Sequence, residues 1–354
     1  MNKIVIKIFT LISVILLCVS CLEDTNSPED FTFYNSADLV SYFEVNGDFI
    51  NSSANPALIS VDDVNDNFSK YLLLDIRKQS EFELGHIAGA VNLEIKDLIK
   101  TIEDNGSSTV EKIIIISEDG QKAAYAASLL RLYGINNVYS LDFGMGYWNH
   151  QFSQIWLDAR NDSRYKSQLH LQANSKSLKT KQLPIIEFSD PSLSMDMLAK
   201  ARIQSLLTDN EYQKSVSTIE ELEEFYHILN KVFENSYIIC YGGENLYNIF
   251  QVNKNIVPGP LFYGGHPRTS AYYNMQNDFK SSENLLTLPL DKTIYVYSYN
   301  GQRSAYLVAY LRILGYNAKS ILFGGVSMFY YYMKYDRFEE CFSESKIKDY
   351  SFVN

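Results

Sequence analysis

The sequence has 354 residues, of which 46% are hydrophobic, so it is long enough for two domains with apolar cores. It carries 42 acidic and 31 basic residues, which gives a net charge of −11. Nucleic-acid binding needs a basic face, so this charge argues against nucleic acid as a partner.

Residues 1–20 have the layout of a secretory signal peptide, with two lysines, an apolar run at 8–17 and then small residues. The apolar run is too short to span a bilayer as a helix. The stretch "LCVSC" that ends at Cys21 resembles a bacterial lipobox. We therefore expect cleavage before Cys21, lipid on its thiol and a membrane-anchored lipoprotein of the bacterial envelope. Leu22 favours the outer membrane, with the protein facing the periplasm or the surface.

Few cysteines remain once the signal peptide is removed. Cys21 is expected to carry lipid, which leaves Cys240 and Cys341. Two cysteines cannot build a disulfide framework for a chain of this length, and no ligand spacing typical of zinc is present. We therefore expect neither a metal nor a cofactor.

Two parts of the chain share a strand–turn–helix–strand pattern. Apolar runs bounded by polar turns predict buried strands, and apolar residues at helical spacing follow the second strand of each part. The predicted strands are 71–76 and 112–117 in the first part, and 236–240 and 293–298 in the second.

The two parts also form an internal repeat. Residues 117–148 align over residues 298–329 without a gap, and repeats of this kind indicate two copies of one structural unit. The residues of the first copy that recur are Ser117, Gly120, Gln121, Ala124, Tyr125, Leu130, Arg131, Gly134, Asn136, Leu141 and Gly144.

Strands that alternate with helices predict an α/β fold with two domains, each a parallel sheet with helices on both faces. A helix over 195–207 is expected to pack between the copies. The predicted division is a signal peptide at 1–20, a tether and N-terminal extension at 21–56, domain 1 at 57–157, a linker with a helix at 158–216 and domain 2 at 217–340.

The stretch "LLLDIRKQSEFELGHIAGAVNL" at 72–93 carries a specific motif. It resembles the first signature of the rhodanese (sulfurtransferase) family, and the tandem arrangement resembles two-domain rhodaneses. The resemblance covers about 57–157 well, whereas over about 217–335 it depends on the second half of that region. The matching signature residues are Asp75, Arg77, Glu81, Gly85, His86 and Gly89, and the resemblance implies that Asp75, Arg77 and His86 mainly organise the fold.

The resemblance also implies that a cysteine opens the active loop and holds a sulfane sulfur as a persulfide. In this sequence serine occupies that position in both copies, at Ser117 and Ser298. A serine hydroxyl ionises far less readily than a thiol, and neither loop contains a histidine to act as base. Persulfide chemistry is therefore not expected, and neither loop provides a confident catalytic residue.

The two loops differ in charge. Glu118 and Asp119 in the first loop would repel an anion, whereas the second loop has no acid and keeps Arg303. The second loop is therefore the predicted anion site and the better place to restore a thiol. The predicted site comprises Tyr299, Asn300, Gly301, Gln302, Arg303 and Ser304.

Three functions remain open. The first is a rhodanese without sulfurtransferase activity that binds a small oxyanion, a peptide or a protein partner. The second is an active thiosulfate-type sulfurtransferase that uses Cys240, although Cys240 aligns with Asp75 rather than with Ser117 and free cysteines are commonly buried. The third is phosphoryl chemistry, since some phosphatases share the fold, but those enzymes also use cysteine.

Overall fold

The structure is a computed structural model that divides into two compact units. One unit comprises residues 1–34 and 187–192, and the other comprises residues 35–186 and 193–354. The predicted signal peptide and Cys21 lie outside the described residues, as do parts of the predicted linker. The described residues are 32–105, 110–160, 169–170, 173–188, 192–221, 235–248, 266–267, 269–335 and 339–354.

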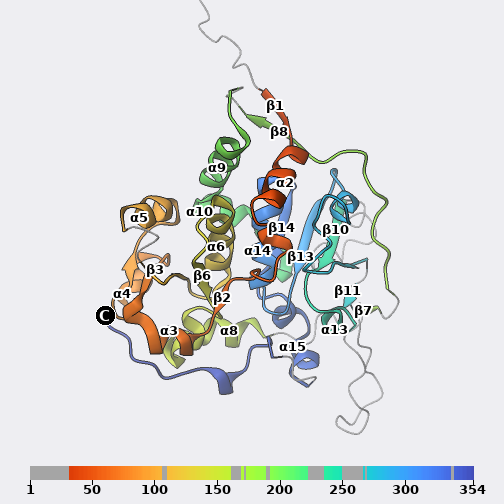
Figure 1. Cartoon of the computed structure of the whole chain (residues 1–354). Coiled ribbons are helices and arrows are strands. Elements are labelled where there is room, and N and C mark those ends of the chain that lie inside the picture. The colour runs from red at the N-terminus through yellow and green to blue at the C-terminus, as the bar shows by residue number, and fades with distance from the viewer. Residues whose placement is uncertain are drawn as a thin grey trace, which may run out of the picture. The chain divides into compact units, whose positions relative to one another are not determined.

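The large unit contains two five-stranded sheets with the same strand topology (Figure 1). All strand pairs within both sheets are parallel. The first sheet has the order β2 (Leu58–Ile59), β6 (Val138–Leu141), β5 (Lys112–Ile116), β3 (Tyr71–Asp75), β4 (Val91–Asn92). The second sheet, read from its β9 edge, has the corresponding order β9 (Val216–Ser217), β14 (Ala318–Ile321), β13 (Thr293–Tyr297), β10 (Ser236–Cys240), β12 (Ala271–Tyr272). The predicted fold class is therefore confirmed.

Two separate two-stranded sheets are also present. β1 (Thr32–Asn35) pairs with β8 (Ile185–Phe188), and β7 (Leu169–His170) pairs antiparallel with β11 (His266–Pro267). The described helices are α2 (Ser36–Val45), α3 (Val61–Asn67), α4 (Gln79–Glu83), α5 (Leu98–Asp104), α6 (Gln121–Tyr133), α7 (Met145–Trp148), α8 (Gln154–Ala159), α9 (Met195–Leu206), α10 (Asp209–Lys214), α13 (Glu244–Tyr247), α14 (Gln302–Ile313) and α15 (Gly325–Tyr335).

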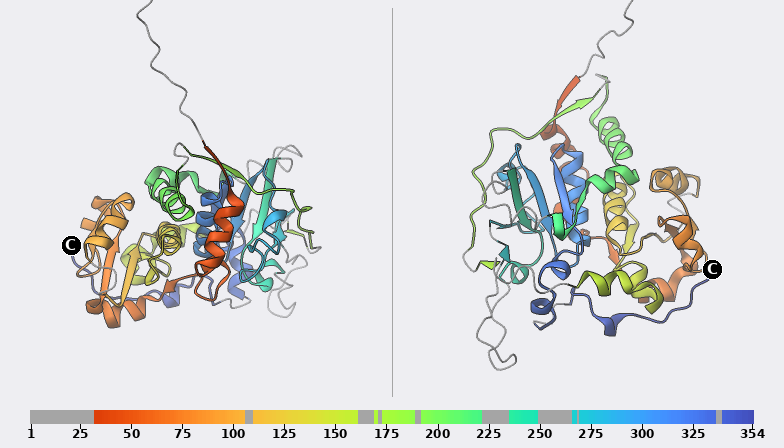
Figure 2. Two further views of the ribbon diagram at one scale, coloured as in Figure 1. Left: turned by 45° about the horizontal axis from the view of Figure 1, so that its top comes forward. Right: turned by 180° about the vertical axis from the view of Figure 1, so that it is seen from behind.

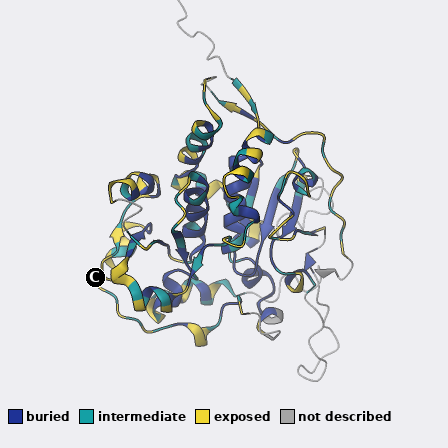
Figure 3. Cartoon of the chain, viewed as in Figure 1, coloured by how far each residue is buried: buried dark blue, intermediate teal, exposed yellow. Residues whose placement is uncertain are grey.

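The central strands are buried on both faces, as their continuous apolar sequences predict. Ile113 and Ile115 point to one face of β5, Ile114 and Ile116 point to the other, and all four are fully buried. Figure 3 shows this burial in the central strands and in α6 and α14. No described helix is long and apolar enough to cross a membrane.

The two halves meet through α6 and α14, which pack against each other and also contact α9 (Figure 1). The helix predicted over 195–207 is thus present as α9, and it lies against both copies. Alanines at 123, 124, 126 and 127 are fully buried, and their small side chains allow α14 to approach closely. Ser128 donates a hydrogen bond to the Tyr306 carbonyl at 2.8 Å.

A pair of glutamines at the starts of these helices links the two turns. The Gln302 amide oxygen accepts from Phe143 N–H at 2.9 Å, while its nitrogen donates to the Gly120 and Leu141 carbonyls. In return, the Gln121 amide oxygen accepts from Phe323 N–H at 2.8 Å. Each half therefore satisfies backbone groups of the other half inside a dry interface.

Both ends of the large unit cross to the opposite half. In the N-terminal extension, Phe43 of α2 packs edge-on against Tyr310, and Asn55 donates to the Tyr241 hydroxyl. At the other end, residues 339–354 run back along the first half (Figure 2). There Phe342 stacks on Trp156, and Trp148 donates to the Ser351 carbonyl. Each terminal segment therefore completes the core of the half to which it is not directly joined.

The gapless repeat alignment is wrong beyond α6. The strained Phe143–Gly144 corner corresponds to Phe323–Gly324, because both pairs have positive φ and the next amide donates to the Ser117 or Ser298 carbonyl. The gapless alignment instead placed Gly144 over Gly325. The second copy has one residue fewer between its helix and its third strand, so the apparent identities at Asn136, Leu141 and Gly144 are out of register.

Replacing Gln302 with alanine should destabilise the chain. The change leaves Phe143 N–H buried without a partner, at a cost of about 1–3 kcal/mol. It also removes bonds to the Gly120 and Leu141 carbonyls, which still accept from Ala124 N–H and Gly144 N–H. Urea unfolding should show a lower midpoint for Gln302→Ala, whereas Gln276→Ala at an exposed position should leave it unchanged. Equal midpoints for both variants would contradict the importance of this contact.

Candidate functional site

The first candidate loop follows β5 and leads into α6. Ser117 is almost completely buried, and its hydroxyl oxygen accepts N–H from Gly120 at 3.1 Å and from Ala123 at 3.2 Å. Gly120 has a φ of +83°, a conformation that glycine adopts without strain. The loop therefore points backbone amides at the side-chain atom of residue 117.

A cavity of about 200 Å³ opens beside Ser117. Two further cavities, of about 280 and 600 Å³, share wall residues with it. The residues shared between neighbouring cavities include Arg77, Lys78, Glu81, Glu118 and Lys122. The first half therefore has a continuous cleft at its strand-to-helix turn.

Two of the three cations of this cleft, Arg77 and Lys122, are already engaged, whereas Lys78 is exposed at its wall. The Arg77 guanidinium makes a buried ion pair with Asp75 at 2.7 Å and also donates to the Gly85 carbonyl. The Lys122 ammonium lies 2.5 Å from a carboxylate oxygen of Asp209 and donates to the Ile76 carbonyl. Neither group is held open toward an incoming anion.

The acids of the cleft, by contrast, lie close to one another. Burial, and next the charges of Glu81 and Asp119, raise the pKa of Glu118, while Arg77 and Lys78 oppose this to a smaller extent. Burial also raises the pKa of Asp119, although Gln121 hydrogen-bonds both of its oxygens. The field at the mouth of the first loop therefore disfavours added negative charge.

The signature residues build the wall of this cleft. Asp75 and Arg77 cross-link the end of β3 to the turn at Gly85. Gly85 has a φ of +151°, and a Cβ there would lie 2.6 Å from the Phe352 ring. His86 stacks on Phe82, and its backbone bridges to Val353. The Glu81 side chain caps α4, and Gly89 forms a tight turn. The contacts of these signature residues stabilise the fold around the cleft.

The second loop is closed rather than open. Ser298 is fully buried, and its hydroxyl oxygen accepts from Ser304 N–H at 3.1 Å. The Ser304 hydroxyl lies 3.2 Å from that of Ser298 and 2.8 Å from that of Ser320. Ser304 stands where the first loop has Ala123, so its side chain fills the space beside the serine at the loop entrance.

The anion site predicted at 299–304 contains a cation that is already paired within the chain. Arg303 forms a two-point ion pair with Glu340, at 2.5 and 3.0 Å, from a segment that sequence reasoning did not connect to this loop. Burial, and next the charge of Glu340, raise the pKa of the nearby Asp142 to about 7. The Arg303 guanidinium is thus neutralised by the Glu340 carboxylate of the same chain.

The other members of that predicted site are enclosed. Tyr299 bonds through its hydroxyl to Asn245 and to Gly243 N–H. Gly301 begins α14 with a φ of +86°, and a Cβ there would lie 2.0 Å from the Gln121 amide oxygen. Tyr299, Asn300, Gln302 and Ser304 are all at most 6% exposed. Burial and the Glu340 pair together favour a sealed turn over an anion nest.

The alternative thiol is poorly suited to catalysis. Cys240 is fully buried, and burial raises the pKa of its thiol to about 12. Cys240 pairs with Tyr297 between β10 and β13, and Asp75 pairs with Ile116 between the corresponding strands β3 and β5. Cys240 therefore occupies the position that corresponds to Asp75. Cys341 is buried in the tail. His266 is buried too and stacks on Tyr247.

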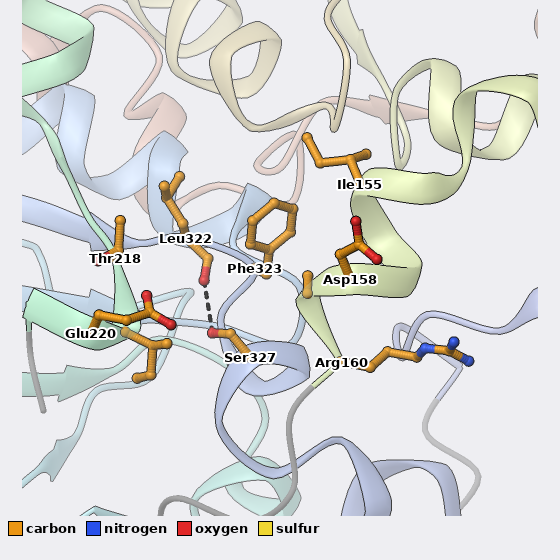
Figure 4. Close-up of a pocket in the computed structure, with 10 residues that line it drawn as sticks. Ile155, Asp158, Arg160, Thr218, Glu220, Leu322, Phe323 and Ser327 are labelled. Atoms are coloured by element: carbon orange, nitrogen blue, oxygen red, sulfur yellow. Dashed lines mark hydrogen bonds between the residues drawn. The ribbon is translucent and has the colours of Figure 1, made fainter.

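A further cavity, of about 380 Å³, lies between α8 of the first half and the β14–α15 turn of the second (Figure 4). Phe323 and Leu322 stand at its centre, between Glu220 on one side and Asp158 on the other. Ile155 also lines the 280 Å³ cavity near Glu118, so the two cavities share a wall. No group of three or more potential metal ligands occurs among the described residues.

The sequence did not reveal the distant residues whose contacts determine whether each loop is open or enclosed. Gln121 and Gln302 were visible as a repeated pair, and a polar residue conserved between two copies at a helix start is a usable signal for such a contact. Glu340 and the tail carried no comparable pattern, because their partners lie far away in the sequence.

The fold and site define an α/β protein in which a strand-to-helix turn presents one side chain to a set of backbone amides beside a cleft. Residues 60–151 match the family described as "Rhodanese-like domain". Thiosulfate sulfurtransferase GlpE of Shewanella oneidensis is 33% identical over 78 residues, which is 22% of this chain and 74% of that protein. Uncharacterized protein YqhL of Bacillus subtilis is 31% identical over 81 residues, which is 23% of this chain and 63% of that protein. The chain therefore belongs to the rhodanese-like domain family.

Solved structures resemble larger parts of the chain only loosely. A thiosulfate sulfurtransferase from Pseudomonas aeruginosa covers 89% of this chain and 48% of its own, at 11% identity and a TM-score of 0.28. A probable thiosulfate sulfurtransferase covers 73% of this chain and 94% of its own, at 15% identity and a TM-score of 0.27. The strand order, and not these superpositions, establishes that the chain contains two five-stranded sheets.

A cysteine at position 117 should react with iodoacetamide at least about tenfold faster than one at position 298, because only Ser117 lines a described cavity. The native thiols Cys240 and Cys341 should remain unmodified in the folded form that begins at Leu22. Peptide mass spectrometry of Ser117→Cys and Ser298→Cys measures both rates. Faster labelling of Ser298→Cys would show that the second loop is the open one.

Proposed function

We propose that this chain is an envelope lipoprotein with tandem rhodanese-like domains that lacks persulfide-based sulfurtransferase activity and uses the cleft beside Ser117 to bind a protein partner. The observation that carries the proposal is the serine at the centre of the first loop. Its hydroxyl accepts two backbone N–H groups at the position where the family resemblance implies a cysteine.

The chemistry of that substitution supports the loss of activity. Sulfur transfer through a persulfide needs a thiolate, which backbone amides and a helix N-terminus stabilise. A serine hydroxyl has a far higher pKa and requires a neighbouring base. Among the described residues, the Ser117 hydroxyl bonds to the N–H groups of Gly120 and Ala123 and to no carboxylate, and the Asp119 carboxylate bonds to Gln121. The same reasoning opposes a cysteine-dependent phosphatase mechanism at this loop.

A sulfurtransferase that uses Cys240 is the rival proposal. Full burial and a pKa of about 12 leave almost no thiolate at neutral pH, and a donor such as thiosulfate would have to enter the core. These properties favour a packing role for Cys240.

The tandem arrangement and the anchor complete the proposal. The shared strand order, the repeated glutamine contact and the two Phe–Gly corners support a second rhodanese-like domain that has diverged from the first. The lipobox-like stretch before Cys21 supports lipidation there, which would hold both domains at a bacterial membrane surface.

The form that begins at Leu22 should show no transfer of sulfur from thiosulfate to cyanide above the buffer rate. Ser117→Cys should gain weak activity, because the loop amides lower the thiol pKa while Glu118 and Asp119 oppose ionisation. Ser298→Cys should gain none, because its loop is enclosed. A wild-type rate that disappears in Cys240→Ala would support the rival enzyme instead.

The full chain should incorporate palmitate when it is expressed in a bacterium that processes lipoproteins. Cys21→Ser should abolish the labelling, because the acceptor thiol is lost, whereas Cys18→Ser should retain it, because residue 18 leaves with the signal peptide. Gel autoradiography or click detection of the labelled band measures this. Labelling that survives Cys21→Ser would refute the proposed anchor.

A further inference from the structure

Three neighbouring cavities share walls along one side of the large unit. The cavity beside Ser117 shares Glu81 and Glu118 with the 280 Å³ cavity, and Ile155 links that cavity to the one between the halves (Figure 4). We call this row the acidic groove and define it by Glu81, Glu118, Phe152, Ile155, Asp158 and Glu220. Three cavities with shared wall residues suit an extended chain better than a small ion.

The charge of the acidic groove is one-sided. Glu81, Glu118, Asp158 and Glu220 contribute four carboxylates to the two larger cavities of the row. The two arginines in the same walls are paired elsewhere, Arg77 with Asp75 and Arg160 with Glu344. Because these arginines are neutralised by their own partners, the groove presents a net negative surface to a ligand.

Apolar side chains lie between the acids. Phe152 and Ile155 line the central cavity, and Phe323 lines the cavity between the halves. Alternation of acids with apolar patches complements a peptide in which basic and apolar side chains alternate. A small oxyanion would find neither an unpaired cation nor a favourable field in the two larger cavities.

Ser117 provides an independent polar contact at one end of the groove. Its hydroxyl oxygen accepts two N–H groups and is only 3% exposed, and among the described residues no acceptor receives its proton. It lines the 200 Å³ cavity, so a ligand acceptor that enters there would complete its hydrogen bonds. A peptide carbonyl oxygen is such an acceptor.

We infer that the acidic groove binds an extended peptide segment with alternating basic and apolar side chains. This inference rests on the proposed function, since it names the class of partner for the same cleft. A lysine or arginine of the peptide pairs with Glu81 and Glu118, an apolar side chain packs on Phe152 and Ile155, and a second basic residue pairs with Asp158. A nearby peptide carbonyl accepts from the Ser117 hydroxyl.

The test uses fluorescence anisotropy with the form that begins at Leu22. The probe is a labelled octapeptide, Gly-Leu-Lys-Leu-Lys-Leu-Ala-Gly, and its comparison carries glutamate in place of both lysines. The lysine peptide should bind and the glutamate peptide should not, and added salt should weaken binding because the groove opens to solvent.

The double variant Glu81→Gln, Glu118→Gln should weaken binding about tenfold or more, since it removes two charge-assisted contacts while keeping side-chain size. Glu111→Gln is the matched control, because Glu111 is exposed beside the opposite end of β5. Circular dichroism melting should show that the double variant remains folded. Unchanged affinity in a folded double variant, or equal binding of the glutamate peptide, would overturn the inference.

The thiosulfate–cyanide assay on the same preparations separates this inference from the proposed function. Absent peptide binding together with absent sulfur transfer would refute the acidic groove alone. Sulfur transfer by the wild type would refute the proposed function, whatever the peptide does.

Discussion

The arrangement of the two halves depends on one constraint, which is that each strand-to-helix turn completes hydrogen bonds of the other turn inside a dry interface. Gln302 reaches Phe143 N–H and two carbonyls of the first half, and Gln121 reaches Phe323 N–H of the second. Buried backbone groups are costly to leave unpaired. The halves are thus fixed face to face, and a loop can remain accessible only on the side away from this contact.

The two sheets share one strand order, but the space beside the loop serine is open in the first half and filled in the second. In the first half the end of β3 carries Arg77, and Glu118 follows the loop serine, so cavities remain beside Ser117. In the second half Gly242 replaces the arginine, and Tyr299 fills the corresponding space with its hydroxyl bonded to Asn245. The second half therefore stabilises the first through packing. Its C-terminal tail crosses to the first half, where Phe342 stacks on Trp156.

The sequence was sufficient for features set by local patterns. Continuous apolar runs identified β3, β5, β10 and β13, and the polar turns, each with one glycine, located the starts of α6 and α14. It was insufficient where distant segments meet. Glu340 neutralises Arg303 in the second loop, α2 is a helix in a segment expected to be an extension, and a one-residue deletion shifts the repeat. Such contacts follow from tertiary packing, which no local spacing encodes.

The central claim is that neither loop nor any native thiol carries sulfane sulfur. The most direct test is intact-mass spectrometry of the form that begins at Leu22 after incubation with thiosulfate and removal of the excess. The account predicts an unchanged mass, because Ser117 and Ser298 cannot form a persulfide and Cys240 is buried with a raised thiol pKa. A mass increase of one sulfur atom, mapped to Cys240 by peptide analysis, would contradict it.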